Sequence, residues 1–389
     1  MANLVLGVIL LLLPVAPTSV TLGIGLVGGL VLAYTNREQL KADIRGTPLS
    51  IFALWLVVPL IASVLFKQSI IFMGIWMACF AGYFVGRRAA ASEMLTESVW
   101  TVPLAAIPVS ALAIYQVWAG VQTPIAWIDN EMADIIKTRA YSTFDNPTML
   151  ADYLALTIPI TLALLWNASP FRRVWGAGSL ALQCTALVFT FSRGAWVATA
   201  GELLLMAAVL MPRFLWVAAS AIVVFVLFGP KSVTVRALSV FTGGDSTTKY
   251  RLTIWKAGWQ MVRDYWVTGV GLGAPAFSRV YVGYEIAGTP AMHTHNLFMQ
   301  LLVEIGLPGL ILFTWYCLDL FYNGYRQLRR HTLNARLQPL FIALLAGLAG
   351  QLGHGLFDHI WYTPKNMLFF WCGAGILSGL MALTGGDNK

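Results

Sequence analysis

The sequence contains few charged residues. Asp, Glu, Lys and Arg make up 11% of its 389 positions, whereas roughly 25% is usual in soluble domains. Hydrophobic residues account for 58%, and the mean hydropathy is +0.72. Apolar runs close to the about 17 to 25 residues that cross a bilayer recur from end to end. The composition therefore excludes a soluble enzyme and predicts a polytopic membrane protein.

Cysteine is also scarce, and no two cysteines have CxxC spacing. Each of the four lies inside an apolar run, where it suits a helix core: Cys79, Cys184, Cys317 and Cys372. We therefore expect no disulfide framework and no zinc site. The chain shows no internal repeat, and its apolar start at Leu4–Val15 lacks a preceding basic region, which favours a first span over a cleaved signal peptide.

The apolar runs are continuous rather than alternating, which favours helices over a β-barrel. We predict an all-α protein with about twelve transmembrane helices and a helical segment outside the membrane. The expected spans are Leu4–Val15, Thr18–Tyr34, Leu49–Leu65, Ile70–Val85, Val99–Trp118, Met149–Trp166, Val174–Phe191, Ala195–Met211, Phe214–Phe228, Gly306–Tyr322, Pro339–Leu356 and Met367–Leu383.

Basic residues indicate how these spans are oriented. With both termini inside, thirteen Lys and Arg residues fall in inside segments and five in short outside loops, in accord with the positive-inside rule. The predicted inside residues are Arg37, Lys41, Arg45, Arg87, Arg88, Arg172, Arg173, Arg213, Arg326, Arg329, Arg330, Arg336 and Lys389.

Two outside segments are long enough to build a site. The first, 119–147, ends in Asn146-Pro147, which predicts a turn before the next span. The second, 230–295, carries the remaining seven basic residues, and this excess favours an anionic partner outside the membrane.

The second segment also contains a predicted amphipathic helix. Apolar residues recur there at steps of three and four: Leu252, Trp255, Trp259, Val262 and Trp266. Because tryptophan suits the membrane interface, we expect this helix to lie along the outer leaflet. The glycines at 269, 271 and 273 that follow predict a tight turn, and a backbone cradle for phosphate is the alternative.

Two arginines in these outer regions are candidates for anion binding. Arg193 lies in a short turn between two spans, where it either snorkels to the interface or binds phosphate oxygens through its guanidinium fork. Arg251 shares one side of the predicted helix with Trp255 and Trp259, so its stem is expected to pass over a buried aromatic surface.

His295 is the candidate proton acceptor. It precedes a polar row at four-residue spacing, and its ordinary titration range suits deprotonation of a hydroxyl group. The row consists of Asn296, Gln300 and Glu304, and Gly306 with Pro308 and Gly309 is expected to interrupt the helix that carries it. Metal binding by His293 and His295 is disfavoured, because helical ligands converge at a spacing of four rather than two.

Other polar residues form competing groups. Asp129, Glu131 and Asp134 would suit a divalent cation, although a solvated acidic loop also explains them. Glu202, Gln351 and His354 are unusual inside predicted spans. His354 and Asp358, one turn apart, either line one cavity or form a structural pair.

Four stretches in this order resemble the bacterial O-antigen ligase and Wzy-type polysaccharide polymerase superfamily. They are STFDNPTMLADYLAL at 142–156, FSRGAW at 191–196, YRLTIWKAGWQMVRDYWVTGVGLG at 250–273, and His295-Asn296 followed by Gly306 and Gly309. The resemblance covers roughly residues 142–309, and the first 140 residues contribute only hydropathy.

The resemblance implies a GT-C-type glycosyltransferase of the bacterial inner membrane with its site facing the periplasm. It implies an undecaprenyl diphosphate-linked glycan as donor and lipid A-core or another glycan as acceptor, without metal, cofactor or nucleic acid. By this resemblance His295, Arg193 and Arg251 are catalytic. Residues expected to bind diphosphate or glycan are Lys249, Asn296, His293, Asn146 and Trp255.

The acceptor remains open at this point. A ligase would use a lipid-anchored core sugar, and a polymerase would use another repeat unit; overall resemblance favours the ligase slightly. Protein O-glycosylation is a third possibility within the same chemistry. A transporter or lipid-linked glycan flippase is the alternative of a different class. Transporters typically show internal repeats and midplane binding residues, whereas here the charged residues gather at one face.

Overall fold

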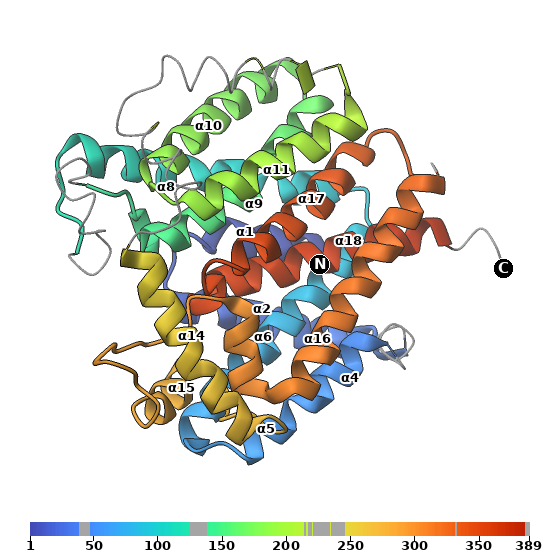
Figure 1. Cartoon of the computed structure of the whole chain (residues 1–389). Coiled ribbons are helices and arrows are strands. Elements are labelled where there is room, and N and C mark those ends of the chain that lie inside the picture. Colours follow the sequence, from blue (N-terminus) through green and yellow to red (C-terminus); the bar gives the residue numbers. More distant parts are fainter. Residues whose placement is uncertain are drawn as a thin grey trace.

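The computed structural model describes residues 1–38, 47–124, 138–213, 246–330 and 333–385, together with residues 215, 216, 220 and 234. Every regular element within these ranges is helical (Figure 1). The α-helices are α1 Ala2–Leu12, α2 Thr18–Thr35, α4 Pro48–Trp55, α5 Val57–Ile61, α6 Phe66–Ala90, α7 Leu95–Val99, α8 Thr101–Trp118, α9 Pro147–Trp166, α10 Pro170–Phe189, α11 Arg193–Leu210, α14 Ser246–Tyr265, α15 Ala274–Tyr281, α16 Leu297–Arg330, α17 Gln338–Gly355 and α18 Pro364–Gly385. Two 3₁₀ turns, η3 Ser142–Phe144 and η4 Ile360–Tyr362, complete the order.

Helices of membrane-spanning length confirm a polytopic all-α protein. Seven described segments are long and apolar enough to cross a bilayer: α2, α6, α7 with α8, α9, α11, α16 and α18. Helices α10 and α17 coincide with two further predicted spans and pack on α9. The count of twelve is not confirmed, because α1 and the run of α4 with α5 are shorter apolar helices and the predicted span Phe214–Phe228 lies almost entirely outside the described residues.

One predicted span is broken rather than continuous. The run Leu49–Leu65 forms two short helices, α4 and α5, that meet at Leu56. Pro59 explains the break, because proline has no N–H to donate to the carbonyl four residues earlier, at Trp55.

The span expected at Gly306–Tyr322 is part of a much longer helix. In α16 the backbone leaves helical geometry only at Gly306, where φ is 72°. A Cβ at this position would lie 2.2 Å from the carbonyl oxygen of Val267, so glycine is required. The predicted interruption of this helix is therefore confirmed, and it separates an outer part from a membrane-spanning part.

The centre of the bundle is the close packing of α6 against α18. Glycine removes the side chain where the two backbones meet, since a Cβ on Gly86 would lie 2.4 Å from the carbonyl oxygen of Cys372. Aromatic rings fill the space around this contact. Trp371 of α18 lies with its ring centroid 5.1 Å from that of Phe80 and 5.2 Å from that of Tyr316.

Helices α14 and α15 form an outer layer with a small core of its own. Ile254, Met261 and Phe277 are buried there. Figure 1 draws this layer on the left, across the molecule from the C-terminus. The opposite face of α14 is open, and Trp259 is 54% exposed. The amphipathic helix is therefore confirmed, and its open aromatic face supports a position along the outer leaflet.

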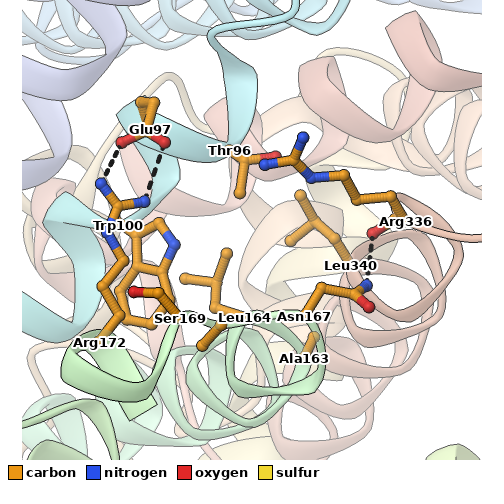
Figure 2. A pocket seen from close by; sticks show the side chains of 11 residues that line it. Thr96, Glu97, Trp100, Ala163, Leu164, Asn167, Ser169, Arg172, Arg336 and Leu340 are labelled. Atoms are coloured by element: carbon orange, nitrogen blue, oxygen red, sulfur yellow. Dashed lines mark hydrogen bonds and ion pairs between the residues drawn. The ribbon is translucent and has the colours of Figure 1, made fainter.

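The other end of the bundle carries residues predicted to lie inside. Figure 2 shows Arg172 of α10 donating two hydrogen bonds to Glu97, at 2.8 and 2.6 Å. In the same pocket Asn167 donates to the carbonyl oxygen of Arg336, at 3.3 Å. Arg172 and Arg336 thus gather at one end, as the predicted orientation requires.

A glycine substitution tests the central packing. Gly86→Ala should lower the thermal unfolding temperature in detergent by several degrees, because overpacking of this kind typically costs about 1–3 kcal/mol. Gly74→Ala is the matched control on the same helix, since nothing lies within 4 Å of its Cβ position. Equal unfolding temperatures for the two variants would contradict this account.

Candidate active site

His295 lies in the turn that starts α16, at the end of the bundle covered by α14. Its φ of 51° is left-handed, so the turn depends on contacts that fix it. Asn296 supplies two of these contacts. Its side-chain oxygen accepts a hydrogen bond from the N–H of Met299 at 2.9 Å, and its amide donates to the carbonyl oxygen of Leu356 at 2.8 Å.

His295 is paired with a carboxylate that the sequence analysis did not assign to it. Nδ1 of His295 lies 3.3 Å from Oδ1 of Asp358, on the segment that follows α17. The side chain of His295 is 20% exposed and that of Asp358 is 9% exposed. With the Nδ1 proton directed at Asp358, Nε2 is the nitrogen left to accept a proton.

Arg251 of α14 binds the same carboxylate from the other side. Its Nη2 lies 3.3 Å from Oδ2 of Asp358, and its Nη1 donates to the carbonyl oxygen of Phe357 at 2.6 Å. Its Nε is buried and has no hydrogen-bond partner in the described structure, whereas Nη1 and Nη2 each carry a second N–H. The guanidinium is therefore anchored and still has N–H groups to offer an anion.

Asp358 is ionised because its hydrogen bond with His295 and the charge of Arg251 outweigh its burial. Burial alone would raise the pKa of Asp358. The hydrogen bond with His295 and the charge of Arg251 oppose that effect and hold the pKa well below its usual range. A fixed negative charge beside His295 stabilises the protonated imidazole when a proton is taken up.

His293 occupies a different environment from His295. Its ring lies with its centroid 4.2 Å from that of His295 and 4.8 Å from that of Tyr362. Its Nδ1 accepts a hydrogen bond from the backbone N–H of His295 at 3.2 Å. Burial holds the pKa of His293 well below its usual range, and the neighbouring imidazoles of His295 and His359 act in the same direction. His293 is therefore neutral, and its buried ring packs against His295 and Tyr362.

Arg193 is the first residue of α11 and is partly buried. Its neighbour Gly194 packs on the segment that carries Asp358: a Cβ there would lie 2.8 Å from Cδ2 of His354 and 3.7 Å from Cβ of Phe357. Phe357 also accepts the hydrogen bond from Arg251. The two predicted arginines therefore approach the same short segment from different helices.

The remaining predicted binding residues have separate positions. Trp255 donates from Nε1 to the carbonyl oxygen of Thr294 at 2.8 Å, which ties α14 to the His295 turn. Lys249 lies exposed in the first turn of α14. Asn146 caps α9, where its side-chain oxygen accepts from the N–H of Thr148 at 2.8 Å. The turn predicted at Asn146-Pro147 is thus confirmed, and the side-chain amide of Asn146 has a structural role as the cap of α9.

The glycine turn after α14 is internally hydrogen-bonded. The N–H groups of Gly269 and Gly271 donate to the carbonyl oxygens of Tyr265 and Glu304, at 2.8 and 3.2 Å. The N–H of Gly273 donates to Oε2 of Glu304 at 2.9 Å. Because these three N–H groups already donate within the protein, they do not form a phosphate-binding cradle. The prediction of a tight turn is confirmed, and the alternative is wrong for these glycines.

The two histidines converge, contrary to the spacing argument. They lie in a turn rather than a helix, and with Asp358 they form a group whose potential ligand atoms all lie within 4.8 Å of one another. Three ligands of these types could hold a transition-metal ion. The carboxylates considered as an alternative, Asp129, Glu131 and Asp134, lie outside the described residues.

His354 and Asp358 do not pair with each other. Nδ1 of His354 lies 3.3 Å from Oδ1 of Asp152 in α9, and Gln351 donates to the other oxygen of that carboxylate at 3.0 Å. Glu202 is buried in α11. Sequence reasoning missed Asp358 as the partner of His295 and Arg251. The sequence feature that could have indicated this role is the position of Asp358, an acidic residue in an outer loop directly after a predicted span.

The described chain is thus a multi-pass membrane protein with an Arg–Asp–His cluster in a layer at one end of the bundle. Comparison with known proteins agrees. Residues 178–314 match the family model described as O-antigen ligase. The chain is also 31% identical over 105 residues to the exopolysaccharide production protein ExoQ of Rhizobium meliloti (strain 1021). The resemblance to the O-antigen ligase and Wzy-type polymerase superfamily is confirmed.

The match with ExoQ is partial. It covers 25% of this chain, and the chain spans only 24% of the length of that relative. The family model includes Arg193, Arg251 and His295, and it ends before Asp358.

Stability at different pH tests the charge of Asp358. Because its pKa is lower in the folded chain than the about 3.9 of an unfolded aspartate, its contribution is complete above pH 4 and is lost as the pH falls through the folded value. Asp358→Asn should lower the unfolding temperature at pH 7, and the difference from wild type should shrink in acid. Asp264→Asn, on the exposed side of α14, is the control. A difference that stays constant from pH 7 to pH 3 would contradict the assignment.

Proposed function

We propose that the chain transfers a glycan from an undecaprenyl diphosphate carrier to a sugar hydroxyl at the periplasmic face of the bacterial inner membrane. The proposed enzyme is an O-antigen ligase that joins O-antigen to lipid A-core. The observation that carries the proposal is the contact of His295 and Arg251 with one buried carboxylate, Asp358. The match of residues 178–314 to the O-antigen ligase family supports the same activity.

The diphosphate is the expected partner of the arginines. Nucleotide sugars are absent outside the inner membrane, so the bond energy must arrive in the lipid carrier itself. Arg251, held in place by Asp358 and Phe357, presents further N–H groups without having to reorganise. Arg193, at the start of α11, is proposed to bind the same leaving group from the other side of the 354–358 segment.

His295 is proposed to act as the base. Its Nε2 removes the proton of the acceptor hydroxyl while that oxygen bonds to the anomeric carbon of the glycan. The bond from the anomeric carbon to the diphosphate oxygen breaks, and the lipid diphosphate leaves with the electron pair. A single displacement of this kind inverts the anomeric configuration. Asp358 stabilises the imidazolium that results.

A polymerase is the second candidate, and a specific observation favours it. The matched relative is described as an exopolysaccharide production protein. In a polymerase the same base and arginines would act on another lipid-linked repeat unit instead of a lipid A-core sugar. Assays with the two acceptors, offered separately to the purified chain, distinguish these reactions.

Substitution of each histidine tests the base. His295→Ala should reduce glycan transfer by ~10² to 10⁴-fold, because a positioned proton acceptor is lost. Binding of the lipid donor should be nearly unchanged, because Arg193 and Arg251 bind the diphosphate. His293→Ala should reduce transfer much less, since its ring is buried behind His295. Both variants are measured in detergent with a polyprenyl diphosphate donor.

The same assay has informative controls. Without vesicles or gradients a flippase would give no product, so transfer by the wild type separates the two classes. Activity should persist in excess EDTA; loss on chelation with recovery on adding a divalent metal would replace the base mechanism with a metal site. Normal transfer by His295→Ala, or loss of donor binding as severe as in Arg251→Ala, would also overturn the assignment.

Conservative substitution tests the guanidinium forks. Arg251→Lys and Arg193→Lys should each lose most activity although charge is kept, because an ammonium group cannot make two parallel hydrogen bonds to phosphate oxygens. Lys256→Arg, on the same helix as Arg251, is the control for a change of cation. Donor binding and transfer are both measured. Near wild-type turnover in the two lysine variants would show that paired hydrogen bonds from the guanidinium groups to phosphate are not needed.

A further inference from the structure

A large groove runs along the bundle from the end opposite His295. It is enclosed by α4, α5, α6, α16 and α18 and has a volume of about 960 Å³. Neither the candidate site nor the proposed function uses it. Its wall is mainly hydrocarbon, with Leu54, Leu60, Met73, Met77 and Phe80 among the lining residues.

The dimensions of the groove match a lipid chain. Its lining on α6 runs from Met73 to Arg87, and the fourteen helical rises between these residues correspond to about 21 Å. One leaflet contributes about half of a hydrocarbon core that is roughly 30 Å thick. The groove therefore extends through more than one leaflet, and Leu54 in its wall is 72% exposed. A small polar ligand would leave this wall uncovered, whereas a hydrocarbon chain covers it.

The mouth of the groove is positively charged. Arg326 and Arg330, one turn apart at the end of α16, line it and are exposed. Arg87, at the end of α6, also lines it and donates to the carbonyl oxygen of Ser378 at 3.3 Å. Asp319 is the one carboxylate among the described lining residues. Guanidinium groups that converge above an apolar wall suit a phosphate attached to hydrocarbon.

We propose that this groove binds an anionic phospholipid from the leaflet at the C-terminal end of α16. The headgroup phosphate binds Arg326 and Arg330, and an acyl chain lies along α6 over Met77 and Met73. The distribution of basic residues makes this leaflet the cytoplasmic one.

The bound acyl chain supports α4 and α5, which contact the outer layer. The groove is walled by α4 and α5, the two short helices separated by the break at Leu56. From there Trp55 donates to the carbonyl oxygen of Ile305 at 3.0 Å, and Val64 donates to that of Val270 at 3.2 Å. Removal of the lipid therefore loosens α4 and α5, and with them the contacts beneath the His295 turn.

The test uses the full chain purified in detergent. Native mass spectrometry should detect retained phosphatidylglycerol. After delipidation, this lipid should raise the unfolding temperature more than phosphatidylcholine with the same acyl chains. The double variant Arg326→Gln, Arg330→Gln should bind phosphatidylglycerol about thirty-fold more weakly, as expected for two arginines near an anionic headgroup. Arg329→Gln, exposed on the same turn but outside the lining, should behave as wild type.

Three results would overturn the proposal. Equal stabilisation by the two lipids would remove the role of headgroup charge. Equal losses in Arg329→Gln and in the double variant would show that only general surface charge matters. Retention of polyprenyl phosphate in place of phospholipid would make the groove a site for the carrier lipid.

Discussion

The buried carboxylate of Asp358 is the interaction on which the outer end of this protein depends. An isolated ionised carboxylate in a buried position is costly, and the cost is recovered only when cations and hydrogen-bond donors surround it. Here they come from α14, through Arg251, and from the turn before α16, through His295. Three segments far apart in the sequence therefore have to meet at one point, and that meeting places the outer layer on the bundle.

The segment from His354 to Asp358 joins this outer cluster to the membrane-embedded core. Its first residue bonds Asp152 inside the bundle, and Gly194 packs on the same imidazole. Its carbonyl groups accept hydrogen bonds from Asn296 and Arg251. The hydrogen bond between His354 and Asp152 is strengthened by the low dielectric of the bundle interior. The segment is therefore held by polar contacts at both of its ends. Rigid support of this kind is what a preorganised site requires.

Much of the architecture followed from local patterns in the sequence. Hydropathy identified the membrane helices, three- and four-residue periodicity identified α14, and Gly306 with Pro308 marked the interruption of α16. The partner of His295 could not be found in this way, because Asp358 is 63 positions distant and no periodicity links the two residues. The convergence of His293 and His295 also escaped prediction. It requires the left-handed backbone of His295, which neither helix nor strand spacing describes.

The charge balance at the site bears on how the proposed reaction would be accelerated. Before reaction, Asp358 offsets the charge of Arg251, and a neutral His295 adds none. As the acceptor proton moves to His295, an imidazolium forms beside Asp358 while the diphosphate gains negative charge on leaving. Positive charge in the cluster therefore increases together with the negative charge of the leaving group. A site of this kind stabilises the transition state more than the bound donor, which is the condition for catalysis rather than for tight binding.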